Sequence, residues 1–219
     1  MTEIDPVAFI RAQTRLMPPS AVPEIMLHLA DEVTPLWKMT EEALRTANMP
    51  PPYWAFAWPG GQGMARYILD NPDIVRGKRV VDFASGSGIG GIAAMKAGAK
   101  SVVAVDIDRL ALYAIDLNAV QNQVDIVISE GVDLSIPYKK ANIIIAGDIC
   151  YQQGTSTAVT RWLRLCAEAG KTVYLADPGR AYVPQEGMEK CAVYEVPTSR
   201  DLEDSDSRTV TVWRMGVVE

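Results

Sequence analysis

The chain has 219 residues, a length that suits one domain with a sizeable buried core. Its 21 basic and 27 acidic side chains give a formal net charge of −6. This balance disfavours non-specific binding to a nucleic-acid backbone, which needs clustered Lys and Arg. The sequence also contains no apolar run long enough to span a bilayer, so we expect neither nucleic acid nor membrane as a partner.

The cysteines and the single histidine restrict the chemistry further. Cys150, Cys166 and Cys191 form no C-x-x-C pair, as is typical of reduced thiols in a cytosolic protein. The opening MTEIDPVAF has no basic segment typical of a targeting signal, which also favours the cytoplasm. The only histidine, His28, lies in an apolar run and is expected to be a helix residue. A Ser-His-Asp triad and a metal site are therefore disfavoured.

Residues 1–52 are expected to form a helical extension of a catalytic core that spans residues 53–219 of the same domain. Asp5 followed by Pro6 is typical of a helix start and predicts a helix over residues 7–16. A second helical stretch is expected from about Pro23.

After a helix predicted over residues 63–70, short apolar strands alternate with helical stretches. Near-continuous Val and Ile runs separated by helices predict a parallel sheet covered on both faces. The last two strands have no helix between them, which predicts an antiparallel hairpin with a mobile, acidic connection over 197–207. The fold class is therefore α/β and Rossmann-like, with a seven-stranded, mostly parallel sheet. The predicted strands are 79–83, 101–106, 125–129, 142–147, 172–177, 190–196 and 208–215.

The first of these strands runs into a glycine-rich turn, VVDFASGSGIGG, at residues 80–91. Glycines let a backbone approach a ligand closely, and the following helix offers unpaired N–H groups to an anion. The spacing of Gly86, Gly88 and Gly91 fits a dinucleotide or S-adenosylmethionine (SAM) equally well. Asp82 favours SAM, because a carboxylate at the strand end can help to position the methionine ammonium. A turn without any ligand is the less favoured alternative. We assign to the cofactor site Asp82, Ala84, Ser85, Gly86 and Gly88.

Two further acids end the next two strands. Asp106 follows Gly86 by twenty residues, and a carboxylate there can accept hydrogen bonds from the ribose hydroxyls of SAM or NAD. A helix N-cap is the alternative for Asp106, although Asp108 suits that role better. Glu130 is placed near the adenine, and a solvated loop acid is an equally good interpretation of it.

The fourth strand ends in Gly147 and Asp148, and Tyr151 follows. Open α/β sheets bind ligands at the carboxyl ends of their strands, so Asp148 is a candidate catalytic residue and Gly147 a neighbour of the cofactor. A solvated capping acid is the alternative for Asp148. The place lacks the Pro-Pro-aromatic signature of DNA amino methyltransferases, which disfavours base flipping.

Trp58 belongs to an aromatic run over residues 53–58, just upstream of the glycine turn. A structural aromatic cluster is the default interpretation of such a run. Its position also permits an aromatic wall over the cofactor, where a ring face would favour the sulfonium charge.

The segments PYWAFAWPGGQGMARYILDNPDIVRGKRVVDFASGSG, GDICY and ADPGR resemble the lysine methyltransferases of the electron transfer flavoprotein (ETF) β subunit, which are seven-strand protein methyltransferases. The resemblance implies a class I methyltransferase fold, SAM as cofactor, and methylation of lysine ε-amines of ETF β near its docking surface for partner dehydrogenases. Ribosomal proteins are a second candidate substrate for bacterial members. The resemblance also implies that Asp148 and Tyr151 form the D-x-x-Y motif associated with catalysis. Ala84 departs from the usual D-x-G-x-G-x-G pattern, and its methyl group is expected to crowd the cofactor slightly.

A lysine must lose a proton before it can attack a methyl group, because its free pKa is about 10.4. A sulfonium charge and desolvation lower that pKa whereas Asp148 raises it, so we expect Asp148 to orient the amine rather than to act as a strong base. Tyr151 is expected to flank the lysine channel, unless it is a packed aromatic at a helix start. The acidic connection is expected to contact a basic substrate surface through Asp201, Glu203, Asp204 and Asp206.

Two alternatives remain from the sequence. A dinucleotide-dependent oxidoreductase shares the glycine turn and Asp106 but does not need the terminal hairpin. A non-catalytic SAM-binding protein would keep every motif. The favoured interpretation is a monomeric, cytoplasmic, SAM-dependent protein-lysine methyltransferase whose partner is its protein substrate.

Overall fold

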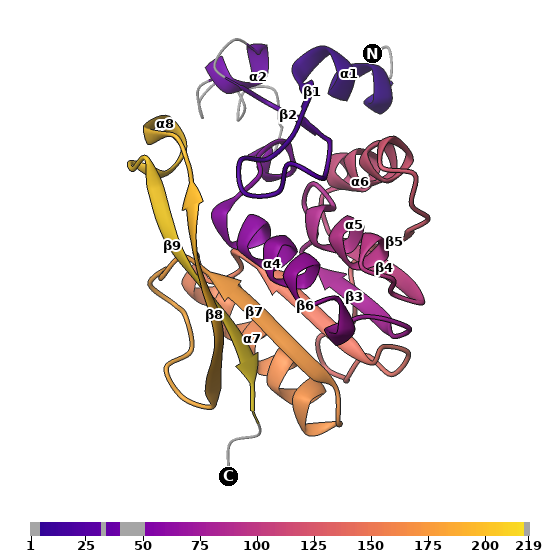
Figure 1. Cartoon of the computed structure of the whole chain (residues 1–219), viewed down its shortest axis with the longest axis vertical. Coiled ribbons are helices and arrows are strands. Elements are labelled where there is room, and N and C mark those ends of the chain that lie inside the picture. Colours follow the sequence, from indigo (N-terminus) through magenta and orange to yellow (C-terminus); the bar gives the residue numbers. More distant parts are fainter. Residues whose placement is uncertain (1–4, 32–33, 40–50, 217–219) are drawn as a thin grey trace.

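Seven strands form one sheet in the order β5 (Val127–Glu130), β4 (Ser101–Asp106), β3 (Arg79–Phe83), β6 (Ile143–Gly147), β7 (Thr172–Asp177), β9 (Ser207–Met215) and β8 (Met188–Pro197) (Figure 1). The strands from β5 to β7 in this order pair in parallel, whereas β9 pairs antiparallel with both β7 and β8. The predicted seven-stranded sheet with a terminal hairpin is thereby confirmed. The computed structural model describes residues 5–31, 34–39 and 51–216.

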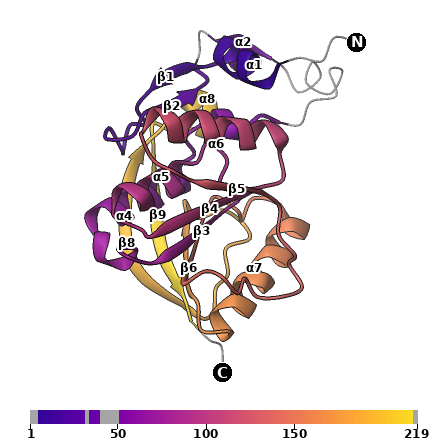
Figure 2. The same ribbon diagram turned by 90° about the vertical axis from the view of Figure 1, so that its right-hand side faces the viewer.

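Helices cover both faces of this sheet, as the apolar strands require. Figure 2 shows α7 (Gln153–Glu168) on the side opposite α4 (Pro59–Asp70) and α5 (Ile89–Lys96). Alternate strand residues serve the two faces: Val80 and Ile145 pack with α4 and α5, whereas Val81 and Ile144 pack with α7. Because each central strand is buried on both sides, its sequence is apolar throughout, and this made the parallel strands predictable.

The edge of the sheet and the start of α4 differ from the prediction. The strand predicted over 125–129 is the short edge strand β5, which begins only at Val127. Helix α4 begins at Pro59, four residues before the predicted helix, and Pro59 occupies its first turn. Proline suits that position because its missing N–H would have no intrahelical partner there. A 3₁₀ turn, η1 (Tyr53–Ala55), precedes α4, and a second one, η2 (Pro72–Ile74), follows it.

The N-terminal segment is not wholly helical. Helix α1 (Pro6–Gln13) begins as predicted, since the Asp5 carboxylate accepts the Val7 N–H at 3.0 Å, but it ends before residue 16. The next residues form β1 (Arg15–Met17), which pairs antiparallel with β2 (Leu27–Leu29). The helix predicted from about Pro23 is therefore wrong over this stretch, and so is the helical placement of His28. A short α2 (Pro35–Lys38) follows, and the rest of that predicted helix lies outside the described residues.

Two asparagines explain why β2 is extended. Asn118, on α6 (Arg109–Gln121), accepts the His28 N–H at 2.8 Å, and Asn122 accepts the Met26 N–H at 3.0 Å. Asn122 also donates to the Met26 carbonyl at 2.6 Å. These side chains add backbone hydrogen bonds to the pairing of β2 with β1, and such tertiary contacts override local propensity. Asn118 donates in turn to the carbonyl of Ser87 at 2.8 Å, which ties the N-terminal segment to the glycine turn.

The connection between β8 and β9 contains a short helix, α8 (Arg200–Glu203). Its last residue, Glu203, is buried, with a side chain only 3% exposed and paired with Arg180 and Arg208. The expectation of a wholly mobile acidic loop that faces a substrate is therefore wrong for Glu203, whereas Asp204 and Asp206 are exposed.

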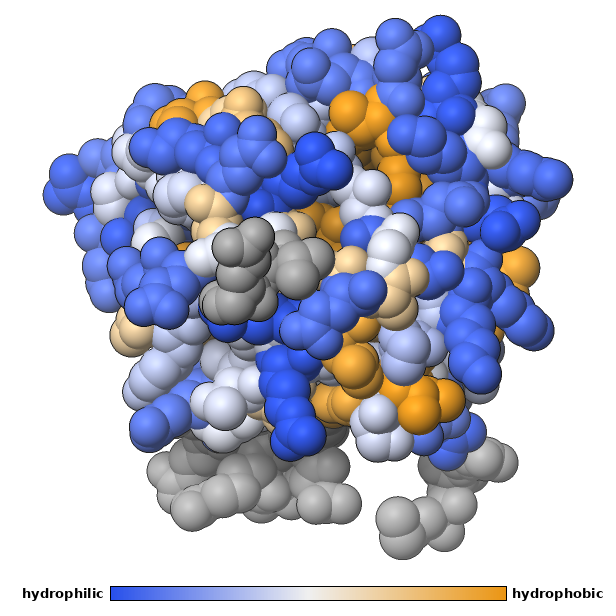
Figure 3. Space-filling model, turned by 90° about the horizontal axis from the view of Figure 1, so that it is seen from below, coloured by the Kyte–Doolittle hydropathy of each residue, from blue (hydrophilic) through white to orange (hydrophobic). Residues whose placement is uncertain are grey.

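The face seen from below in Figure 3 lies opposite the N-terminal segment. It is mostly hydrophilic, and its hydrophobic residues form small separate groups rather than one continuous patch. Over the described residues, no helix has the length and apolar character needed to cross a bilayer.

Candidate functional site

The strand order locates the site. From β3 the chain passes to β4 on one side, whereas β6 flanks β3 on the other. In an open α/β sheet such a reversal leaves a crevice outside the carboxyl ends of the strands, and ligands bind there. The predicted site residues other than Trp58 lie at or just after the ends of β3, β4, β5 and β6, so they gather along the carboxyl edge of the sheet, whereas Trp58 precedes α4.

In the glycine turn after β3, every second residue from 84 to 88 has a positive φ: Ala84 at 53°, Gly86 at 54° and Gly88 at 85°. Glycine adopts this conformation readily, whereas alanine is strained in it. A side chain built on Gly86 would meet nothing closer than 3.9 Å, so the space above the turn is open. Gly88 is also the N-cap of α5, and no side chain caps that helix start.

Asp82 lies beneath this turn and is only 5% exposed. Its Oδ2 accepts the Ser85 hydroxyl at 2.5 Å and the Gly91 N–H at 2.8 Å. Burial raises the pKa of Asp82 to about 7, against the lowering effect of these two hydrogen bonds. Its contacts fix the shape of the turn, and its expected role at the methionine ammonium stays a prediction.

Asp106 joins the turn to the next strand. Its Oδ2 accepts the Gly86 N–H at 2.8 Å, and its Oδ1 accepts the Asp108 N–H at 3.0 Å. Each carboxylate oxygen can accept a second hydrogen bond, so two acceptors remain for a ligand. The N-cap role falls to Asp108, as predicted, because its side chain accepts the Leu110 N–H at 2.9 Å.

Glu130 lies beside Asp106, since the two are paired positions of β5 and β4. It is exposed, as is Ile107, whose side chain is 84% exposed. Ile107 is thus an exposed apolar side chain beside two acids, which makes it a candidate contact for an apolar ligand group at this edge. Sequence analysis missed Ile107, although its position directly after Asp106 was the available signal.

Asp148 follows β6 with a φ of 57°, another strained backbone position. Its Oδ2 accepts the Gly61 N–H at 2.8 Å, and its Oδ1 accepts Arg180 Nη2 at 2.9 Å. Burial raises the pKa of Asp148 to about 6, although Arg180 and the Gly61 N–H both oppose this shift. A side chain on Gly60 would collide with the Asp148 carboxylate at 2.6 Å, so glycine is required there.

A glycine is also required at position 147, where the end of β6 packs closely against the start of α4. A Cβ atom at this position would lie 2.8 Å from the backbone nitrogen of Gly61. Close contact between the end of β6 and the start of α4 is therefore possible only without a side chain. The contacts of Gly147 are with α4, and its expected contact with the cofactor stays a prediction.

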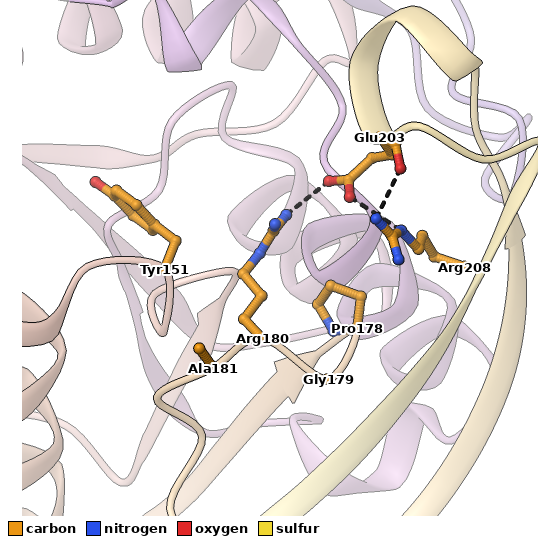
Figure 4. Close-up of a pocket in the computed structure, with 7 residues that line it drawn as sticks. All are labelled: Tyr151, Pro178, Gly179, Arg180, Ala181, Glu203 and Arg208. Carbon is orange, nitrogen blue, oxygen red and sulfur yellow. Dashed lines mark hydrogen bonds and ion pairs between the residues drawn. The ribbon is translucent and has the colours of Figure 1, made fainter.

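Arg180 is the main functional candidate that sequence analysis missed. It lies three residues beyond the end of β7, where Asp177 accepts its backbone N–H at 2.6 Å. The guanidinium donates from Nη2 to both Asp148 and Glu203 (2.9 and 2.7 Å). Figure 4 shows Glu203 between Arg180 and Arg208. The signal was a charged residue just after a core strand, within the ADPGR segment.

A pocket of about 250 Å³ opens at this network. Tyr151 lies across it from the ion pairs and is 48% exposed (Figure 4). The pocket is formed by the loop after β6, the loop after β7 and the α8 connection. Its lining residues are Tyr151, Pro178, Gly179, Arg180, Ala181, Glu203 and Arg208.

Aromatic rings connect the pocket to the N-terminal segment. Tyr53 lies 5.5 Å from Tyr151 and 5.9 Å from Trp58, measured between ring centroids. The ring of Trp58 also contacts Phe56, and its face lies 5.8 Å from the Arg180 guanidinium carbon. The predicted aromatic cluster is thus present, and Trp58 lies at the site through Arg180. Its contact with a sulfonium stays a prediction.

Known proteins with similar sequences identify the family. The chain is 37% identical over 201 residues to the Homo sapiens electron transfer flavoprotein beta subunit lysine methyltransferase, covering 89% of this chain and 75% of that protein. The Xenopus laevis protein of the same name is 33% identical over 217 residues, covering 95% and 86%. The chain belongs to the ETF β lysine methyltransferase family. The resemblance inferred from the sequence is confirmed.

The fold of this ETF β lysine methyltransferase family member agrees with class I methyltransferase structures. A Pyrococcus horikoshii protein described as a "putative RNA methyltransferase" aligns with a TM-score of 0.58 at 17% identity, covering 82% of this chain and 100% of that one. The ribosomal protein L11 methylase of Lactobacillus delbrueckii subsp. bulgaricus aligns at 0.52 and 20%, covering 74% and 81%. Both likenesses concern the fold alone.

A family model described as ribosomal protein L11 methyltransferase (PrmA) matches residues 66–150, the segment that holds the glycine turn and Asp148. Family and fold together identify SAM as the cofactor, and they decide against the dinucleotide oxidoreductase. The residues present fit SAM, because the open turn at Gly86 is followed by the free acceptors of Asp106.

Proposed function

We propose that the protein transfers methyl groups from SAM to lysine ε-amines of the ETF β subunit. The observation that carries this proposal is the position of Asp148 and the contacts that hold it there. Its carboxylate, with a side chain 11% exposed, is held at the carboxyl edge of the sheet by Gly61 and Arg180, and Tyr151 lies across an adjacent pocket. The relatives that match nearly the whole chain are named for this reaction and this substrate.

Several residues are suited to hold the cofactor. Asp106 has acceptors for the ribose hydroxyls, and Glu130 and Ile107 lie beside it for the adenine. The turn over 84–88 is open for the methionine end, with Trp58 on the side of Arg180. When bound there, SAM supplies an electrophilic methyl group.

The chain's own residues then have to orient a lysine amine. Asp148 is held in one position by hydrogen bonds to both of its oxygens, and Oδ2, which accepts only the Gly61 N–H, keeps a further acceptor position. A fixed carboxylate can align the nitrogen of the incoming amine, and alignment of reacting groups is a large source of rate enhancement. Tyr151 and Tyr53 offer an aromatic wall for the lysine side chain. A cytoplasmic location and a monomeric state stay predictions.

Incubation with SAM and purified ETF, followed by mapping of methylated lysines by mass spectrometry, tests the proposal. We expect mass increments of whole methyl groups on lysines of the β subunit only. SAM binding measured by calorimetry without any transfer to ETF would instead favour a non-catalytic SAM-binding protein.

Ribosomal protein L11 is a second candidate substrate, favoured by the family model that matches residues 66–150. That match leaves out the loop after β7, α8 and the terminal hairpin, which line the pocket. We therefore expect L11 to be methylated far more slowly than ETF β in a parallel reaction. Faster transfer to L11 would reverse the assignment of the substrate.

A further inference from the structure

The negative charge of Asp148 is compensated on one side by a cation. Arg180 donates to Oδ1 of Asp148 from Nη2 at 2.9 Å and from Nε at 3.3 Å. The two side chains are only 21% and 11% exposed, so solvent screens this pair weakly. The opposite carboxylate oxygen, Oδ2, is held by the Gly61 N–H at the start of α4.

The position of Arg180 is fixed by a second acid. Its Nη2 donates to Oε1 of Glu203 at 2.7 Å, and Oε2 of Glu203 accepts from Arg208 at 3.1 Å. Charges thus alternate from Asp148 through Arg180 and Glu203 to Arg208 (Figure 4). The guanidinium lies between two carboxylates, and this holds it beside Asp148.

The proposed chemistry needs a neutral lysine, whereas the carboxylate of Asp148 favours a charged one. An ammonium has no lone pair, so a lysine must be neutral when it attacks a methyl group. An uncompensated buried carboxylate stabilises the charged form of a nearby lysine and raises its pKa. Asp148 alone would therefore bind the substrate well, but in a form that cannot react.

Building on the proposed lysine methylation, we propose that Arg180 is a positioning residue that keeps Asp148 charge-compensated, so that the substrate lysine is neutral at the site. The carboxylate can then accept a hydrogen bond from the neutral amine without capturing a proton from it. The proton of the incoming ammonium leaves to solvent before the nitrogen–carbon bond forms.

The balance of charge around the pocket supports this role. The ionisable groups around Asp148, Tyr151 and Arg180 comprise acids at the ends of β4, β6, β7 and α8, two arginines, two phenols and one thiol. Burial raises the pKa of Tyr151, and it raises that of the Cys150 thiol to about 12, so these groups stay neutral. Loss of Arg180 would leave Arg208 as the sole cation among them. The groups are Asp106, Asp148, Asp177, Glu203, Arg180, Arg208, Tyr53, Tyr151 and Cys150.

The pH dependence of kcat on ETF β tests the proposal. In Arg180→Met the rising limb of kcat should move to higher pH by about one to three units, the shift that a nearby charge produces. The kcat at pH 7 should fall about tenfold for each unit, with KM unchanged or lower, and raising the pH should restore much of the activity. Arg66→Met is the matched control, since Arg66 also bridges two carboxylates, Glu24 and Asp70, and does not contact Asp148. Its rising limb should coincide with that of the wild type.

If folded Arg180→Met keeps the rising limb of kcat at the wild-type pH and loses the same factor of kcat at every pH, the proposal is overturned. Arg180 would then be a structural residue. An equal shift in Arg66→Met would also overturn it, because the effect would then not depend on the contact with Asp148. Absence of methylation of ETF β by the wild-type protein would contradict the proposed function itself.

A measurement on the wild-type protein avoids any folding problem of the variant. ETF β with ¹³Cε-labelled lysine is titrated by NMR in complex with the protein and S-adenosylhomocysteine, which has no sulfonium charge. We expect the pKa of the bound target lysine to lie below its free value of about 10.4. A pKa at or above that value would show that Asp148 retains the proton despite Arg180, and the proposal would be wrong.

Discussion

Gly61 and Asp148 lie 87 residues apart in the chain, yet the Gly61 N–H donates a 2.8 Å hydrogen bond to Oδ2 of Asp148. Gly61 is in the first turn of α4, where backbone N–H groups have no intrahelical partner. Asp148 therefore caps a helix that is distant in sequence while it faces the pocket beside Arg180. The two interpretations of this residue, capping acid and reactive-site carboxylate, describe the same geometry, so its substitution must be tested for both.

Asp106→Ala should weaken SAM binding by about ten- to a hundredfold, which corresponds to the loss of charge-assisted hydrogen bonds of roughly 1.5–3 kcal/mol. The variant loses acceptors for the ribose and also the bond that holds the Gly86 N–H. Calorimetry measures the change. Asp108→Ala is the control: loss of this N-cap should cost about 1 kcal/mol of stability with little effect on SAM affinity. Unchanged SAM binding in Asp106→Ala would place the cofactor elsewhere.

Ala84→Gly should stabilise the protein. Alanine at a φ of 53° carries steric strain of about 1–2 kcal/mol, and part of the gain on its removal is offset by the greater freedom of glycine in the unfolded chain. We expect a net increase of about 0.5–1 kcal/mol in the free energy of unfolding, measured with denaturant. The matched control, Ala158→Gly in the exposed part of α7, should lower it by about 1 kcal/mol. Equal losses in both variants would show that position 84 is not strained.

The sheet could be predicted because its central strands are buried on both faces and are therefore apolar without interruption, as in Ile143–Gly147. The strand β2 could not, since besides its pairing with β1 it is held by the side chains of Asn118 and Asn122, about 90 residues further along the chain. Local sequence carries no signal for such contacts.

The candidate site shows the same division. The turn at Gly86 and the strand-end acids Asp106 and Asp148 could be placed by their position after apolar runs. Arg180 and Glu203 could not be paired, because they meet only when the β8–β9 connection folds back over the end of β7. The acidic composition of that connection favoured a solvated loop, and burial of Glu203 became possible only through two arginine partners.

Stability should depend on pH through Asp82. Burial raises the pKa of the Asp82 carboxyl group to about 7 in the folded protein, whereas the ordinary pKa of an aspartate is 3.8. Between these values the unfolded chain binds fewer protons, so the free energy of unfolding falls as pH rises from about 4 to 7. The difference corresponds to at most about 4 kcal/mol.

Asp82→Asn keeps an acceptor for Ser85 and removes the titration, so the loss of Tm between pH 4 and 7 should become smaller. It should not vanish, because the pKa of Asp148 is raised to about 6 by burial. Asp116→Asn, on the exposed surface of α6, is the control and should leave the pH dependence of Tm unchanged. If the Tm of the wild type rises between pH 4 and 7, in parallel with the Tm of Asp82→Asn, then Asp82 is ionised in the folded protein.

Substitution of the exposed acids of the β8–β9 connection, Asp204 and Asp206, should affect substrate binding, whereas substitution of the buried Glu203 should affect stability. Asp204→Asn with Asp206→Asn should raise KM for ETF β at low salt, with a smaller effect at high salt, because exposed charges act through screened attraction. Glu203→Gln should instead lower Tm, since it weakens two ion pairs of a buried carboxylate. SAM affinity should stay unchanged in the double variant. Unaltered KM at low salt would assign the exposed acids to solvation alone.

Asp148→Asn is expected to separate chemistry from capping. The amide oxygen can still accept the Gly61 N–H, so the end of α4 keeps its hydrogen bond, and Arg180 keeps Glu203 as its partner. The fold should therefore survive, with Tm lowered by a few degrees and SAM affinity nearly unchanged.

The charge that aligns the substrate amine is nevertheless gone in this variant, and Arg180 has lost one of its two carboxylate partners. We expect kcat and kcat/KM on ETF β to fall together by at least about a hundredfold, as is typical when an interaction made in the transition state is lost. Single-turnover methylation with labelled SAM measures the chemical step directly. A folded Asp148→Asn protein that methylates at the wild-type rate would leave Asp148 with only its capping role, and the reactive site would have to be sought elsewhere along the sheet edge.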